Sequence, residues 1–276
     1  MNELMLDTDG SRSGIMQEAF DVKIPATTKS YQPVANEKFV SLLHTTADMM
    51  GLELSNPTIG LAKEGQQVFG TFDVEGQNHV GDMVKLMLGW RNSYDKSLAA
   101  GVCFGSRVFV CSNLMFTGYA GEDNEIFGTV FHKHTVNVDR VFPERVKVAL
   151  GQFEKFRQFQ DGFYTRLQDT MVGDYWAYGA VVKAVMADVI PNANVKKVVN
   201  EWHYQQERPD VIADDRPWHP EFQERNAFSL MNAFTEVAKE YQEKNPVVSS
   251  ARDIATSKFF HDEFIRKNCN TEEYAI

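Results

Sequence analysis

The chain has 276 residues, 43% hydrophobic and 24% charged, which is typical of one large or two small globular domains. Its formal net charge of −10 argues against a histone-like polycation and against a generic binder of anionic membranes. No apolar run approaches the roughly 18 residues that span a bilayer, and the amino terminus lacks the pattern of a signal peptide, so we expect a cytoplasmic protein without membrane contact. Cys103, Cys111 and Cys269 form no CxxC pair, which indicates buried thiols in a reducing compartment.

The amino-terminal half changes from an irregular segment to a helix and then to β-structure. Residues 1–35 are rich in Thr, Ser, Asp and Gly, and we expect a flexible arm there. A helix is predicted over 36–51, with Asn36 as its N-cap and Gly51 at its end. From Pro57 the pattern favours strands. The predicted β-elements are a hairpin that turns at 63–66 and strands over 79–88, 101–111 and 125–134.

The carboxy-terminal half is predicted to be helical. One long amphipathic helix is expected over 143–169, and its aromatic stripe of Phe153, Phe156, Phe159 and Phe163 should pack into the core. Further helices are expected over 174–189, 194–206, 226–244 and 249–264. The sequence therefore predicts an α+β fold, a twisted and mainly antiparallel sheet packed against carboxy-terminal helices. Its three regions are an arm over 1–35, a β-rich region with a leading helix over 36–141, and a helical region over 142–276.

Motifs for catalysis and cofactor binding are missing from the sequence. It contains no GxSxG elbow, no GxGxxG or GxxxxGK[ST] phosphate loop and no HExxH helix, so we expect neither an enzyme nor a cofactor. His132 and His134 alternate on a predicted strand and would share one side of it. Because a metal site needs further ligands, we expect these histidines to be exposed or hydrogen-bonded.

Binding of single-stranded nucleic acid requires cations for phosphates and aromatic rings for bases. Residues 85–157 hold ten Lys and Arg against seven Asp and Glu, a net +3, so the rest of the chain carries −13. The predicted contacts are Trp90, Arg91, Tyr94, Lys96, Arg107, Lys133, Arg140, Arg145 and Lys147. In the alternative interpretation, Trp90 belongs to the core, Asn92 and Ser93 cap a turn, and the charges are simply solvated.

The stretch Leu88–Phe116, LGWRNSYDKSLAAGVCFGSRVFVCSNLMF, resembles a family of phage and plasmid proteins defined by domain of unknown function nine-three-two. The resemblance rests on an Asn-Ser-aromatic-Asp-x-Ser element and on an Arg-Val-x-Val-Cys-x-Asn strand end. It extends to His134-Thr135 and to the helix over 226–241. The matching positions are Asn92, Ser93, Tyr94, Asp95, Ser97, Arg107, Val108, Val110, Cys111 and Asn113.

The resemblance implies a phage, prophage or plasmid origin and no established activity. We therefore expect a single-stranded-DNA-binding protein of phage nucleic-acid metabolism, acting in replication, recombination or transcription inside an infected bacterial cell. The alternative is a protein-interaction factor that recruits a phage polymerase or inhibits a host defence enzyme. In that case the acidic segment 207–225 would be its docking surface.

Overall fold

The computed structural model describes residues 12–79, 84–108, 114–115, 128–206, 222–242 and 246–265. Its strands are β1 (Arg12–Ser13), β2 (Leu54–Ala62), β3 (Gln67–His79), β4 (Val84–Ser93), β5 (Ala100–Val108), β6 (Leu114–Met115) and β7 (Val130–His132). Its longer helices are α1 (Met16–Asp21), α2 (Asn36–Met49), α3 (Val138–Leu150), α4 (Phe153–Asp169), α5 (Asp174–Met186), α6 (Val195–Tyr204), α7 (Ala227–Gln242) and α8 (Pro246–Phe260). A 3-10 turn, η1 (Asn192–Asn194), precedes α6, and a π-helical turn, η3 (His261–Ile265), follows α8.

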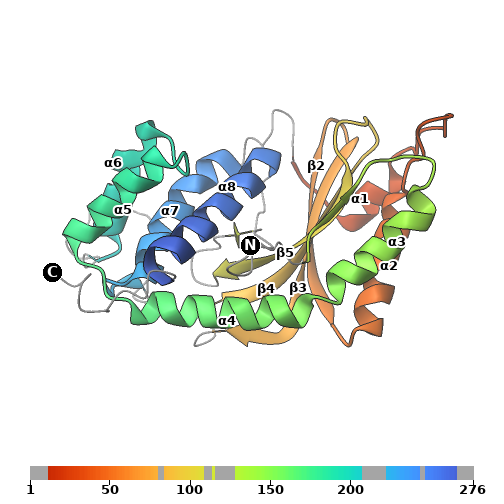
Figure 1. Cartoon of the computed structure of the whole chain (residues 1–276). Helices are drawn as coiled ribbons and strands as arrows, with labels where there is room; N and C mark the ends of the chain where they lie inside the picture. The colour runs from red at the N-terminus through yellow and green to blue at the C-terminus, as the bar shows by residue number, and fades with distance from the viewer. Residues whose placement is uncertain are drawn as a thin grey trace.

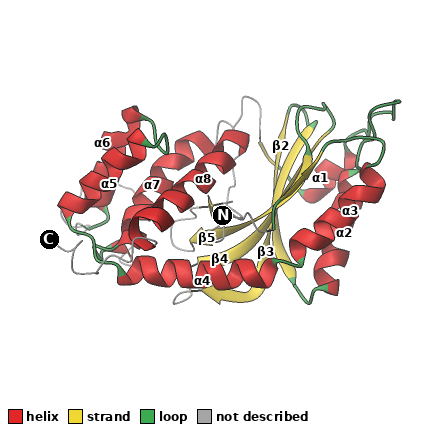
Figure 2. Ribbon diagram, viewed as in Figure 1, coloured by secondary structure: helices red, strands yellow, loops and turns green. Residues whose placement is uncertain are grey.

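The strands form one antiparallel sheet in the order β1-β2-β3-β4-β5-β6, and β7 also pairs with β5 (Figure 2). The turn from β2 to β3 places Lys63, Glu64 and Gly65 at φ values of 48°, 56° and 82°, which confirms the predicted hairpin. The α+β prediction is confirmed as well, because the sheet is antiparallel and most helices follow it in the chain (Figure 1).

One face of the sheet is covered by α2 and α3 (Figure 1). Alternate residues of the strands point to this face, and Phe72, Leu86 and Trp90 pack there with Phe39 of α2 and Phe142 of α3. The opposite face holds a smaller apolar cluster around Met87 and a series of polar side chains. The two faces therefore differ in chemistry, as expected when side chains alternate along a strand.

The predicted long helix over 143–169 is wrong in its extent. Two helices, α3 and α4, occupy this region and are separated at Gly151 and Gln152, and α3 begins at Val138, so Pro143 lies inside it. A glycine gains no side-chain packing in a helix and costs backbone entropy, so the break falls there. The aromatic stripe is core as predicted, since Phe153, Phe156 and Phe163 are buried and Phe159 packs against the core while partly exposed.

The predicted flexible arm is wrong for the residues described between 12 and 35. β1 pairs with β2, and Ala19, Tyr31 and Val34 are buried. The N-cap of α2 is Ala35, whereas the Asn36 side chain is buried and donates from Nδ2 to the carbonyl oxygen of Ala19 at 2.8 Å. A few well-spaced apolar side chains are enough to pack this segment, although its average composition is polar.

A second hydrophobic cluster joins the carboxy-terminal half of α4 to α5, α6, α7 and α8. α4 links the two clusters, because its Phe153 packs with the sheet and its Leu167 packs with these helices. α5 and α6 lie at the end of the molecule farthest from α2 and α3 (Figure 1). No described helix is both long enough and apolar enough to cross a membrane.

Candidate nucleic-acid interface

Trp90 is a core residue. It is 1% exposed, its ring meets Phe39 edge-on with centroids 5.5 Å apart, and it covers Gly70 so closely that a Cβ there would lie 2.4 Å from the indole nitrogen. The side chain points to the face that α2 covers, because it occupies the same alternation as Leu86 and Leu88. The prediction that Trp90 stacks on bases is therefore wrong.

Tyr94 is also buried, with 5% of its surface exposed. Its hydroxyl oxygen accepts a hydrogen bond from the backbone N–H of Asn36 at 3.0 Å, and its carbonyl oxygen accepts one from the Tyr31 hydroxyl at 3.3 Å. Burial raises the pKa of Tyr94 above its ordinary value, so the phenol stays neutral. Tyr94 holds the chain before α2 against the sheet and has no ring face for a base.

The polar residues around Tyr94 fix the backbone, as the alternative interpretation predicted. Asn92 donates from Nδ2 to the carbonyl oxygen of Val34 and to Oδ1 of Asn36, both at 2.7 Å. Ser93 Oγ donates to the Leu98 carbonyl oxygen and accepts from the Leu98 N–H, each at 3.0 Å. The Asn-Ser-Tyr-Asp element is therefore a structural connection between the sheet and the amino-terminal segment.

Arg91 and Phe131 lie on the other face of the sheet in a cross-strand row. Arg91 of β4 is opposite Phe69 of β3 and Gly101 of β5, and Gly101 is opposite Phe131 of β7. The Arg91 guanidinium carbon is 4.4 Å from the centroid of the Phe131 ring, close enough for a cation–π contact. Burial lowers the pKa of Arg91, but a guanidinium starts high enough to stay charged at neutral pH.

Gly101 creates the space for this contact. A Cβ at Gly101 would lie 2.1 Å from Cδ1 of Phe131, so the phenyl ring lies directly across the glycine backbone. The Phe131 residue is 43% exposed, so its side chain is accessible to solvent even though Gly101 and Arg91 contact the ring. Phe131 is therefore a partly exposed aromatic residue on this sheet, whereas Trp90 and Tyr94 are buried.

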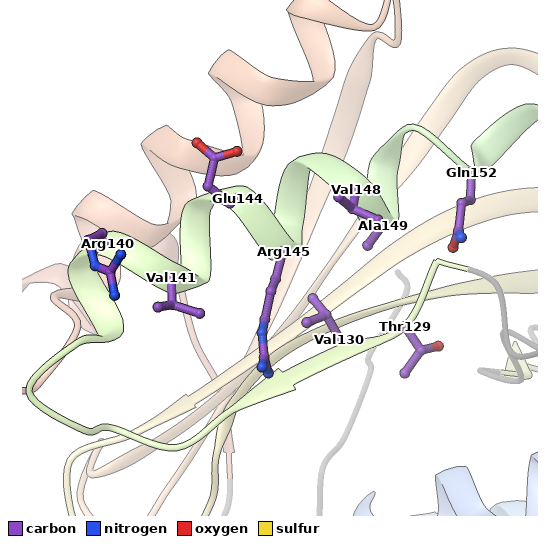
Figure 3. A pocket seen from close by; sticks show the side chains of 9 residues that line it. All are labelled: Thr129, Val130, Arg140, Val141, Glu144, Arg145, Val148, Ala149 and Gln152. Carbon is purple, nitrogen blue, oxygen red and sulfur yellow. The ribbon is translucent and has the colours of Figure 1, made fainter.

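A groove of about 550 Å³ runs between β7 and α3, on the side of β7 that faces α3, so the Arg91 and Phe131 side chains do not line it (Figure 3). It is lined by Thr129, Val130, Arg140, Val141, Glu144, Arg145, Val148, Ala149 and Gln152. Arg145 reaches from α3 toward β7, whereas Glu144 points away from the strand (Figure 3). Nη1 of Arg145 donates to the carbonyl oxygen of Phe131 at 3.4 Å, which joins the helix to the edge strand.

The charge around the groove is predominantly positive. Arg140 and Arg145 are exposed on α3, Lys133 is exposed just after β7, and no described carboxylate forms an ion pair with any of them. Asp139 lies next to Arg140 but pairs with Lys38 at 2.8 Å. The groove can therefore attract an anion, although the chain as a whole is acidic.

Three other predicted cations lie elsewhere. Lys147 is exposed on α3 but does not line the groove. Lys96 lies in the turn after β4 with a positive φ of 66°, and its Nζ is 4.6 Å from the centroid of the Tyr31 ring. Arg107 lies opposite Lys85 on β5, away from the Gly101 end, and its side chain is outside the described set. Of the predicted list, the structure brings Arg140 and Arg145 together at the groove, and it places Arg91 on the opposite face of the sheet, against the Phe131 ring.

His132 ends β7 and His134 follows it, and both rings contact aromatic residues. The expectation that these histidines are exposed or hydrogen-bonded is wrong for His134, which is 6% exposed and whose two ring nitrogens have no hydrogen-bond partner among the described residues. The His132 ring is parallel to Phe142 at a centroid distance of 6.3 Å, and His134 meets Tyr31 edge-on at 5.7 Å. Burial lowers the pKa of both imidazoles, with further contributions from Arg145 at His132 and from His132 at His134. No group of three or more potential metal-binding side chains occurs in the described part of the chain.

Sequence reasoning missed Phe131, although a signal was present. The strand FHKH places His132 and His134 on one face, so Phe131 and Lys133 must point to the other. The alternation that pairs the two histidines therefore also predicts an outward-facing ring at Phe131, the residue that precedes them. The acidic segment of the alternative hypothesis lies outside the described residues over 207–221, and Arg225 at its end pairs with Asp174 at 2.9 Å.

The comparisons with known proteins agree with the resemblance found in the sequence. No curated protein and no solved structure matches the chain. A family described as a domain of unknown function, DUF932, matches residues 24–261. The chain belongs to this family. The DUF932 region begins after β1 and α1 and includes strands β2 to β7, the groove and the helices through α8, so both halves of the fold are parts of one family domain.

Proposed function

We propose that this DUF932 protein binds single-stranded DNA and serves phage nucleic-acid metabolism as a replication, recombination or transcription cofactor. The observation that supports the proposal is the Phe131 ring, partly exposed above Gly101, with the Arg91 guanidinium against it and Arg145 bonded to its carbonyl oxygen. An aromatic ring beside cations on a sheet is a common platform for unpaired bases. Trp90 and Tyr94 have no part in this revised interface.

Each residue of the proposed DNA-binding surface has a distinct expected role. Phe131 stacks on one base, and Arg91 keeps the ring in place while adding positive charge beside it. Arg140 and Arg145 contact phosphates along the groove between α3 and β7, and Lys133, which follows β7 outside the groove lining, contacts a third phosphate beside Phe131. Single-stranded DNA suits this arrangement, since base stacking on Phe131 requires a base that is not stacked within a duplex.

Fluorescence anisotropy with a labelled single-stranded oligonucleotide at two salt concentrations tests the proposal. With three phosphate contacts, the logarithm of the association constant should fall against the logarithm of salt with a slope of about −2. Phe131→Leu should weaken binding by about 5- to 150-fold, since a stacked base contributes roughly 1–3 kcal/mol. Arg145→Gln should make this negative slope shallower by about 0.7, because one phosphate contact is lost.

Lys147→Gln provides the matched control. It removes the same charge from the same helix but from outside the groove, so its effect on affinity should stay within about twofold at moderate salt. Absence of binding at low salt would refute the proposal. Equal losses for Arg145→Gln and Lys147→Gln would also refute it, because they would indicate attraction by overall charge without use of the groove.

A further inference from the structure

α5 carries four large apolar side chains on the outside of the molecule, while Trp176 and Val185 pack partly buried against the core. The residues that it packs against the core are Ala177, Ala180, Val181 and Ala184. The residues that it exposes are Tyr175 at 77%, Tyr178 at 40%, Val182 at 54% and Met186 at 81%. A surface helix normally shows the opposite distribution, and a helix that is apolar on all sides is typical of burial on all sides. The exposed stripe of α5 therefore has the character of an interface.

The size of the stripe fits a pair of identical subunits. The four side chains expose on the order of 500 Å², near the upper limit for an apolar patch on a monomer. Two copies placed face to face would bury about 1,000 Å² from these side chains alone, close to the roughly 1,200 Å² at the lower end of specific interfaces. Neighbouring backbone and the partly exposed Trp176 can supply the remaining area.

The charges beside the stripe are already neutralised within the chain. Asp174 pairs with Arg225 at 2.9 Å, and Lys183 pairs with Glu263. A chain of net charge −10 repels its own copy, so association requires a face without excess negative charge. The described part of α5 also offers no unpaired cation for a nucleic acid or an anionic lipid surface.

The arrangement of the stripe is compatible with two-fold symmetry about Gly179. A Cβ at this glycine would meet no atom within 4 Å, so another helix can approach closely. Tyr175 lies one turn before Gly179, and Val182 lies one turn after it. In an antiparallel pair, Tyr175 of one subunit would meet Val182 of the partner subunit. Both subunits would use the same surface, so the assembly would stop at a dimer.

We propose that the protein forms a two-fold homodimer through α5. The proposal is independent of DNA binding, because α5 lies at the far end of the molecule from α3 (Figure 1). Sedimentation equilibrium of the full chain without DNA should give a mass near twice 31.4 kDa at micromolar concentration. Met186→Glu buries an unpaired carboxylate twice in the dimer and should raise its dissociation constant about 100-fold or more.

Val136→Glu is the matched control, since Val136 is 55% exposed and lies between β7 and α3. This variant should remain dimeric, and circular dichroism should show that both variants fold. In addition, Gly179→Cys should form a covalent dimer under mild oxidation, beyond any formed by the parent chain. A monomeric parent chain at all concentrations would overturn the proposal, as would a dimer that Met186→Glu leaves intact.

Discussion

Replacing Trp90 tests whether this residue stabilises the core or binds DNA, because the first role predicts a loss of folding stability and the second a loss of DNA affinity. The side chain is 1% exposed, so truncation to alanine removes about 200 Å² of buried apolar surface, worth about 5 kcal/mol at 25 cal/mol per Å². Partial collapse of the site reduces the expected loss to about 3–5 kcal/mol. Because small domains have only about 5–15 kcal/mol of stability, Trp90→Ala should be close to unfolded.

Trp90→Phe gives the measurable version of this test. It keeps an aromatic contact with Phe39, and it forfeits no hydrogen bond, since the indole N–H has no partner among the described residues. We expect a loss of about 1–2 kcal/mol in urea unfolding followed by circular dichroism. DNA affinity of the folded variant should stay unchanged. A loss below about 0.5 kcal/mol, combined with tenfold weaker DNA binding, would refute the assignment of Trp90 to the core.

Three further predictions concern the sheet. Gly101→Ala should weaken DNA binding more than it lowers stability, because the new Cβ displaces the Phe131 ring; anisotropy and urea unfolding measure the two effects. Burial lowers the pKa of His134, so the unfolded chain binds more protons below about pH 6.5, and stability should fall there by up to about 1.4 kcal/mol per pH unit. His134→Asn should flatten that decline between pH 7.5 and 5.5, and an unchanged decline would contradict it. Lys85→Met should lower the free energy of unfolding by about 3–5 kcal/mol, because it removes the ammonium group that lies 3.3 Å from the buried Asp73 carboxylate. Adding Asp73→Leu should recover part of this loss, which urea unfolding of the double-mutant cycle measures.

Most of the fold could be predicted from local patterns in the sequence. Alternation along β5 assigns Val102 and Phe104 to one face and Cys103 to the other, as observed. The order of strands followed by helices was sufficient for the α+β class. The break at Gly151 was missed because the apolar spacing continues across it, and the spacing does not reveal that α3 and the carboxy-terminal half of α4 pack in different hydrophobic clusters.

Only part of the proposed interface could be predicted from the sequence. Arg91, Arg140 and Arg145 stay predicted contacts, but Trp90 and Tyr94, which were predicted to stack on bases, are buried, whereas Phe131 is partly exposed. Trp90 and Tyr94 lie among the charged and polar residues of the stretch 90–97, and nothing local distinguishes an indole on the covered face of a sheet from one on the open face. The packed segment before α2 was missed for a similar reason, since Tyr31 and Val34 find their partners far along the chain.

By itself the sequence determined the family, the helices and strands in outline, and the absence of common catalytic motifs, because these depend on residue types and on spacing within short windows. Tertiary structure alone decided which face of the sheet α2 and α3 cover, and with it the burial of Trp90 and the exposure of Phe131. It also decided that the outer stripe of α5 is not covered by any other described helix or strand. Exposure depends on what packs against a side chain, and the packing partner comes from a distant part of the chain.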